Sequence, residues 1–290
     1  MKKYAFAIAL LLASPAFAAT PEQTYLTERD ALIAKLNPPG DMVAPTDAAT
    51  KAMERGRVEL GKRIREVIGP VSVKGFSGAG EYSVGSLFQG DMEFGVLDAL
   101  VFTKDTQTRL VVTTTSLADR WFKSRDGVSP EKGAPPPKDL QSALKRDEFY
   151  TRATPGDAAV GNMGELPVTK PAGVEFVYAM LALRRQDIVP VPAEEMLIGV
   201  IVPPRVYILN APIAKIKIMP ACEKLSKDAD AKANRMARSK DDKVANAAED
   251  ERERGDAAMR KCFTEQVKSN PVFAKLTKQA QDFVDMLAAK

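Results

Sequence analysis

Two cysteines, the only ones in the 290-residue chain, lie symmetrically about a break in a long helical pattern. Cys222 and Cys262 each stand 20 residues from position 242, which falls inside the polar break at 239–243. If the flanking segments 220–238 and 243–268 fold back as antiparallel helices, the two sulfurs lie level and within reach of each other. The spacing therefore predicts a helical hairpin stapled near its base, with arms that extend roughly 30 Å beyond the disulfide at about 1.5 Å per residue.

The positions expected to face each other across this hairpin are mostly small. They are Cys222, Leu225, Ala229, Ala233 and Met236 on the first helix, and Val244, Ala248, Glu251, Gly255, Ala258 and Cys262 on the second. Alanine and glycine let two backbones approach closely but bury little apolar area. We therefore expect the disulfide to stabilise the hairpin by about 3–4 kcal/mol in the chain-entropy model. The alternative is a pair of free, buried cysteines.

The first 18 residues have the pattern of a bacterial secretory signal. Two lysines precede a short apolar run at 5–13, and Ala16-Phe17-Ala18 forms a small-x-small cleavage site. The run is too short to span a bilayer, so we expect cleavage after Ala18 and a mature protein in the periplasm. An uncleaved N-terminal anchor is the alternative. The oxidising periplasm would favour the predicted disulfide.

A second apolar stretch, 196–210, raises the question of a membrane span. Pro203, Pro204 and Arg205 lie at its middle, where a spanning helix would lose backbone hydrogen bonds and bury a charge. The stretch therefore predicts two buried strands, and we expect no integral membrane span.

The rest of the chain predicts an α+β fold with a mostly antiparallel sheet. Helical patterns at 20–36 and 46–68 are followed by a meander near 81–115, with strands at 81–88, 92–102 and 108–115. Short helices are expected at 116–124 and 138–150, and further strands near 174–210, at 174–183, 196–202 and 205–210. Residues 152–173 contain several Pro and Gly and no apolar period, which predicts a long loop.

The organisation expected along the chain is a signal peptide at 1–18, an α+β domain at 19–215 and a helical region at 216–290. The α+β domain begins with the two N-terminal helices, and the helical region consists of the stapled hairpin and a final helix. An apolar stripe marks one face of that final helix, made by Phe273, Leu276, Ala280, Phe283, Val284 and Leu287. We expect this stripe to pack against the body of the protein.

Composition excludes several chemistries. The chain has no histidine, so it has no Ser-His-Asp or Cys-His catalysis and no imidazole metal ligand. Pairing of both cysteines would also remove a thiolate nucleophile and a zinc-thiolate site, and no Walker or dinucleotide-binding motif is present. We expect no metal, no cofactor and, at a formal net charge of only +4, no nucleic-acid partner.

Asp98 is the one weak catalytic candidate. It interrupts an otherwise apolar strand face in the meander, and a second carboxylate nearby could form the acid–base pair of a glycan hydrolase. The ordinary explanation is a carboxylate that caps a turn or pairs with Arg109 at the end of the sheet.

Two groups of residues are candidates for a contact surface. Arg120, Trp121 and Lys123 place the only tryptophan between bases on a short helix, although packing of that tryptophan against the core is the common arrangement. The second group lies on the hairpin and consists of Arg235, Arg238, Arg252 and Arg254. These features favour a soluble, non-enzymatic envelope binding or assembly factor. It is expected to use its hairpin and the loop 152–173 to contact another envelope protein. The alternatives are a carboxylate-dependent glycan hydrolase in the periplasm and a small-ligand carrier.

Overall fold

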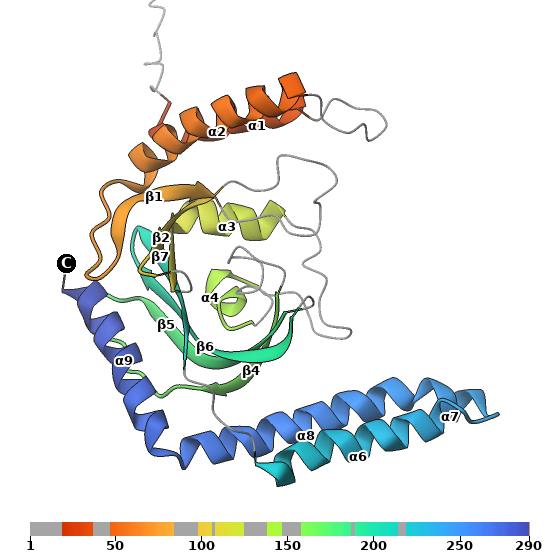
Figure 1. Cartoon of the computed structure of the whole chain (residues 1–290). Helices are drawn as coiled ribbons and strands as arrows, with labels where there is room; N and C mark the ends of the chain where they lie inside the picture. The colour runs from red at the N-terminus through yellow and green to blue at the C-terminus, as the bar shows by residue number, and fades with distance from the viewer. Residues whose placement is uncertain are drawn as a thin grey trace, which may run out of the picture.

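The computed structural model describes residues 19–36, 47–83, 98–105, 108–124, 138–146, 158–186, 189–213 and 219–289. The predicted signal segment at 1–18 lies outside these ranges, as do the ends of several predicted elements. Within them the chain folds as a mixed helix and strand protein built on one antiparallel sheet (Figure 1). The predicted fold class is confirmed.

The sheet contains seven strands in the order β1-β2-β3-β7-β6-β5-β4, and every neighbouring pair is antiparallel. The strands are β1 (Ser77–Ser83), β2 (Ala99–Thr103), β3 (Arg109–Thr114), β4 (Ala158–Glu165), β5 (Phe176–Gln186), β6 (Val189–Val202) and β7 (Arg205–Pro212). The first three form the predicted meander, and β6 and β7 are joined at Pro203-Pro204, where the two apolar runs were expected to separate.

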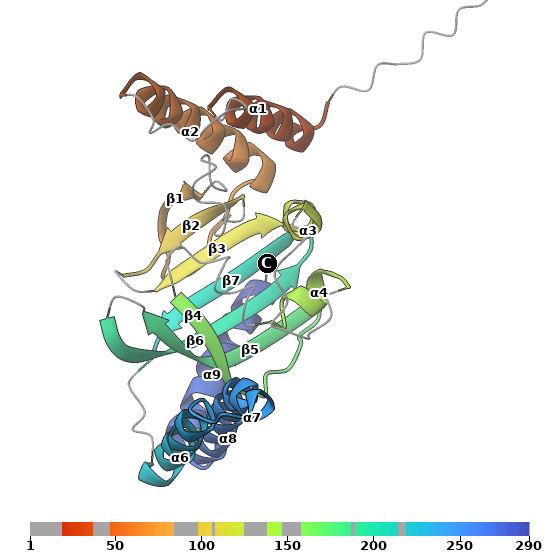
Figure 2. The same cartoon turned by 90° about the vertical axis from the view of Figure 1, so that its right-hand side faces the viewer.

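The helices gather at the two ends of the chain and on both faces of the sheet. They are α1 (Pro21–Leu36), α2 (Asp47–Ile68), α3 (Thr115–Ser124), α4 (Leu140–Ala143), α6 (Pro220–Met236), α7 (Asp242–Asn246), α8 (Ala248–Lys268) and α9 (Pro271–Ala288). The sheet curves around α3 and α4, while α9 lies against its opposite face (Figures 1 and 2). The final helix therefore packs on the body, as its apolar stripe predicts.

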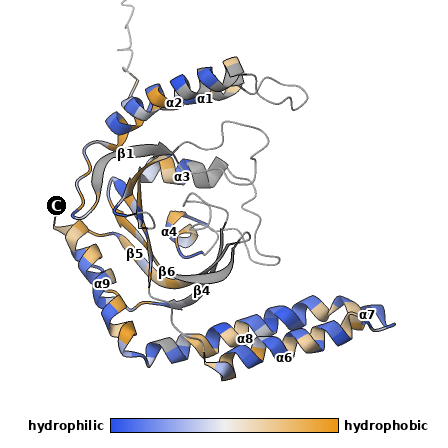
Figure 3. Ribbon diagram, in the orientation of Figure 1, coloured by the Kyte–Doolittle hydropathy of each residue, from blue (hydrophilic) through white to orange (hydrophobic). Residues whose placement is uncertain are grey.

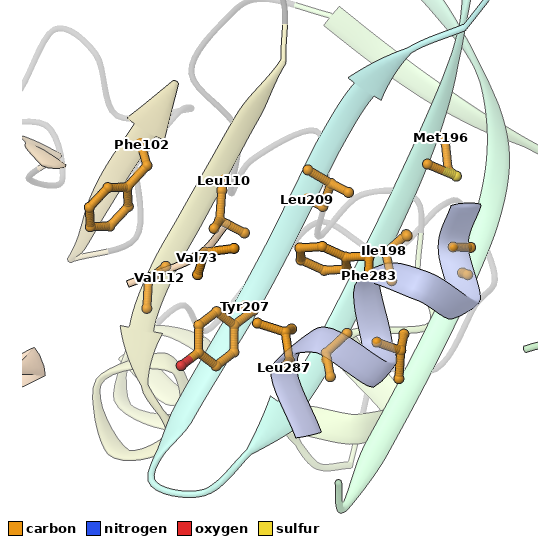
Figure 4. Close-up of a cluster of buried hydrophobic side chains, with 14 of the residues drawn as sticks. Val73, Phe102, Leu110, Val112, Met196, Ile198, Tyr207, Leu209, Phe283 and Leu287 are labelled. Carbon is orange, nitrogen blue, oxygen red and sulfur yellow. The ribbon is translucent and has the colours of Figure 1, made fainter. Parts of the chain in front are cut away.

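Burial on both faces explains why the central strands are almost continuously apolar. Along β3, Leu110 and Val112 belong to the core cluster that includes α9, whereas Val111 belongs to the cluster that includes α3 and α4. Figure 4 shows Phe283 and Leu287 of α9 beside Tyr207, Leu209 and Ile198. Alternate side chains of one strand thus enter two different cores.

The prediction of a loop throughout 152–173 is wrong, because residues 158–165 form strand β4. This strand is an edge of the sheet and pairs only with β5, with a register shift between Asn162 and Gly164. The glycines of β4 lower its local propensity to form a strand, and the pairing with β5 stabilises the extended conformation instead. Residues 166–175 contain no helix or strand.

Both edges of the sheet are partly covered. On β1, the Gly80 carbonyl accepts a hydrogen bond of 2.8 Å from the Arg65 guanidinium of α2. On β4, Gly164 lies against Thr264 of α8, where an added Cβ would come within 2.9 Å of the threonine methyl group. Such covering of an edge limits pairing with other chains.

We expect Phe283→Ala to destabilise the protein by about 3–5 kcal/mol, because it removes a side chain that is only 7% exposed and leaves a cavity between α9 and the sheet. Urea unfolding followed by circular dichroism measures this change. Lys275→Ala, on the exposed face of the same helix, is the matched control and should change stability by less than about 0.5 kcal/mol. Equal effects of the two substitutions would contradict the placement of α9.

Candidate functional site

Helices α6, α7 and α8 form a hairpin, here called the stapled arm, that projects from the sheet (Figure 1). Cys222 of α6 and Cys262 of α8 form a disulfide, with a Cα–Cα distance of 5.4 Å. The turn between the long helices falls at 237–241, close to the predicted break. The disulfide and the antiparallel helical pair are therefore confirmed.

The seam of the arm is as tight as its small residues predict. A Cβ atom added at Gly255 would lie 2.1 Å from the Cβ atom of Ala229, so only glycine fits there. Ala229, Ala233 and Ala248 are buried along the same seam. The close approach brings α8 near the backbone of α6 at Ser226.

Three of the expected seam positions are wrong. Leu225 is 41% exposed and Val244 is 38% exposed, while Ala258 is exposed and its neighbour Met259 is buried instead. The facing residues of the two helices do not keep the predicted alternation of three and four residues. The segment before Ala248 forms a separate short helix, α7, which places Val244 outside the seam.

Polar contacts also cross the seam. Ser226 donates a hydrogen bond of 2.8 Å to Asp256, and Arg252 donates one of 3.0 Å to the Asn234 side chain. Lys232 of α6 forms an ion pair of 2.9 Å with Glu251 of α8, whose carboxylate is largely buried and also lies 2.8 Å from Arg254. The hydrogen bond from Lys232, supported by the charge of Arg254, lowers the pKa of Glu251.

The base of the arm is fixed to the body through α8. Phe263, next to the disulfide, is 1% exposed and belongs to the same core cluster as the sheet and α9. The neighbouring Thr264 contacts Gly164 of β4. On the α6 side, the backbone N–H of Met219 donates a hydrogen bond of 2.9 Å to Gln266 of α8. Helix α6 is thus held to the body through its contacts with α8.

The four predicted contact arginines of the arm separate into two places. Arg252 pairs with Glu249 and Arg254 with Glu251, so both are engaged along the length of α8. Arg235 and Arg238 are exposed near the turn, at the far end of α6. The structure therefore does not gather the four into one patch.

The candidates on α3 lie far along the chain from the arm, and Arg120 contacts another helix. Arg120 forms an ion pair of 3.1 Å with Asp30 of α1. The backbones of Trp121 and Lys123 belong to α3, but their side chains lie outside what the structure describes.

Asp98 is buried and ties α1 to the sheet. Its carboxylate accepts a hydrogen bond of 2.7 Å from the Tyr25 hydroxyl and pairs with Arg29, while its carbonyl accepts one of 2.7 Å from Thr113. Burial raises the pKa of the Asp98 carboxyl, although the charge of Arg29 and the hydroxyl of Tyr25 oppose that rise. A carboxylate held in this way has a structural role, which argues against Asp98 as an acid or base.

The expected pairing of Asp98 with Arg109 is wrong. Arg109 lies opposite Thr103, at the other end of the β2–β3 pair from Asp98. The actual partners, Tyr25 and Arg29, are four residues apart and share one face of α1. That spacing is visible in the sequence, but nothing in the sequence indicates which buried acid the face would meet.

No group of three or more Asp, Glu, His or Cys residues is arranged to hold a metal ion within the described ranges. Of the helices that the structure describes, none is both long enough and apolar enough to cross a membrane. Comparisons with protein-family models, with curated proteins and with solved structures find no match to this chain.

We expect Gly255→Ala to destabilise the arm by about 1–3 kcal/mol, although alanine is the better helix former by about 1 kcal/mol. The added methyl group would overlap Ala229 and force the helices apart. Thermal unfolding and hydrogen exchange of α6 amides measure the change. The double variant Gly255→Ala with Ala229→Gly should recover part of the loss, and a stabilising effect of Gly255→Ala alone would show that the helices do not touch there.

The pKa of Glu251 also predicts a dependence on pH. Because this pKa is lowered in the folded arm, the stabilisation from Glu251 is complete above the ordinary glutamate value of about 4.3. It is lost as the pH falls through the lower folded value. Urea unfolding at several pH values should show Glu251→Gln less stable than the wild type at pH 6, with the difference closing below about pH 4. A difference that stays constant with pH would exclude the ion pairs as its cause.

Proposed function

We propose that this protein is a non-enzymatic binding or assembly factor of the bacterial cell envelope, and that the stapled arm is its contact surface for another envelope protein. The signal-like segment at 1–18 supports a periplasmic location. The observation that carries the proposal is the arm itself, which projects from the body and is closed by the disulfide.

The form of the arm supports a role in binding. Its disulfide, its Gly255–Ala229 contact and the burial of Phe263 together hold two long helices in one arrangement before any partner arrives. A surface ordered in advance loses less conformational entropy on binding, so more of the contact energy appears as affinity. Most residues on the outer faces of α6 and α8 are exposed, so these faces are accessible to a second protein.

The charges of the arm support a specific partner. Residues of both signs alternate over its surface, with pairs such as Lys224–Asp228 and Lys227–Glu223 within α6. A partner with the complementary alternation would be selected, and proteins with a different charge order would be rejected by like-charge contacts. Each exposed pair contributes little to stability, so these residues can be used for recognition.

The glycan-hydrolase alternative has less support. It depends on Asp98, and the carboxylate of Asp98 is engaged with Tyr25 and Arg29. The small-ligand carrier remains a prediction, and no described contact favours it over the arm.

A shortened arm tests the proposal. Replacing residues 230–254 by a short Gly-Asn turn removes equal lengths of α6 and α8 and keeps both Cys222 and Cys262. We expect cross-linking in intact cells, followed by mass spectrometry, to lose the envelope proteins captured by the full-length chain. Thermal unfolding of the purified variant checks that the sheet still folds.

A charge-order variant is the matched control for the shortened arm. Exchanging Lys224 and Asp228 keeps the ion pair, the length of the arm and its net charge. It reverses the order of these two charges on the surface of α6. It should weaken capture without abolishing it. Retention of every captured protein by the shortened arm would contradict the proposal.

A further inference from the structure

The far end of the stapled arm carries basic side chains that the rest of the arm does not neutralise. This end, here called the arm tip, comprises residues 235–244, from the last turn of α6 into α7. Arg235, Arg238, Lys240 and Lys243 are all exposed, against two acidic residues, Asp241 and Asp242. The ribbon of this end of the arm, coloured by residue hydropathy, contains both hydrophilic and hydrophobic residues (Figure 3).

The tip differs from the shaft of the arm in its pairing. Along the shaft, most cations are joined to acids in pairs such as Lys232–Glu251 and Arg252–Glu249, although among the described residues Arg260 and Lys261 of α8 also form no ion pair. In the part of the chain that the structure describes, none of the four tip cations forms an ion pair. One of the two tip acids is also engaged, since the Asp241 carboxylate accepts a hydrogen bond of 2.9 Å from the backbone N–H of Lys243.

Helix stability accounts for only part of this charge. Arg235 lies in the last turn of α6, where a cation interacts favourably with the helix dipole. Lys240 belongs to neither helix and gains nothing from a dipole. Asp241 and Asp242 lie among the four cations and offset half of their charge, so residues 235–244 keep a net charge of +2.

The position of the tip suits a flat surface. It is the part of the arm most distant from the Cys222–Cys262 staple, roughly 30 Å along two helices at about 1.5 Å per residue. Val244, beside the cations, is 38% exposed and offers one apolar side chain for shallow insertion.

We propose that the arm tip binds an anionic lipid surface through Arg235, Arg238, Lys240 and Lys243. A stable protein partner requires an interface of about 1,200 Å² or more with an apolar or aromatic centre, and the tip offers a single exposed valine. A lipid surface requires only basic side chains near its headgroups, each of which raises binding by a factor of about five. This inference rests on the proposed function and deepens it, because it adds a membrane contact to an arm that is proposed to bind an envelope protein.

Co-sedimentation of the purified full-length mature chain with vesicles tests the proposal. We expect binding to vesicles of phosphatidylcholine with phosphatidylglycerol, and none to vesicles of phosphatidylcholine alone. Binding should fall several-fold as salt rises from about 0.05 to 0.2 M, because the Debye length shortens. A variant in which the four tip cations become glutamine should lose at least about tenfold in binding.

A control variant of equal charge separates the tip from the whole surface. It replaces four exposed lysines outside the tip by glutamine: Lys224, Lys227, Lys261 and Lys275. This variant should bind anionic vesicles within about twofold of the wild type, and circular dichroism should show all three proteins equally helical. Equal loss in both variants, or no binding by the wild type at low salt, would overturn the proposal.

The outcome also distinguishes this inference from the proposed function. Binding to polyglutamate-coated beads is measured alongside binding to vesicles. If the wild type binds the beads as tightly as the vesicles, the tip is a site for an acidic protein and the lipid proposal fails. Loss of vesicle binding in the tip variant with unchanged cross-linking of envelope proteins would support the lipid contact and leave the protein contact to the shaft. If capture fails in the shortened arm, while the tip variant still captures its partners and binds vesicles as tightly as the wild type, the protein contact is supported and the lipid proposal fails.

Discussion

The arm keeps its shape because α6 and α8 meet where Gly255 faces Ala229, at a distance that admits no further methyl group. This contact buries little apolar surface, so it depends on the disulfide that holds the helices level at Cys222 and Cys262. Restriction of the unfolded chain by that link is expected to stabilise this seam by about 3–4 kcal/mol in the chain-entropy model. The proposed contacts of the arm require this interaction, since two separated helices would present no defined surface.

The arm is continuous with the core of the protein. Phe263, one residue after the disulfide, lies in the same cluster as α9 and the outer face of the sheet. A force on the arm therefore reaches the sheet through packed side chains. At the opposite end of the sheet, Asp98 joins α1 to the start of β2 through Tyr25 and Arg29. Helix α1 and the stapled arm are thus both fixed to one antiparallel sheet.

The sequence predicts those elements whose signals are local. Cysteine spacing about the break at 239–243 and the stripe on α9 both correspond to contacts in the structure. The sequence does not predict strand β4, because Gly161 and Gly164 interrupt the alternation of apolar and polar residues that marks a strand. Its pairing with β5 makes this segment a strand. The partner of Asp98 was missed for a similar reason, since strand register places Arg109 at the far end from it.

By itself, the sequence determined the order of most helices and strands, β4 excepted, together with the antiparallel character of the sheet and the level of the disulfide. Each of these follows from residue spacing along a helix or strand. Only the tertiary structure decided which acid meets which base and which seam residues are buried. It also decided that, among the described residues, the four tip cations are unpaired while most cations of the shaft are paired. These outcomes depend on the rotation and separation of whole elements. A rotation of one helix by a fraction of a turn exchanges a buried residue for an exposed one, as it does at Ala258 and Met259.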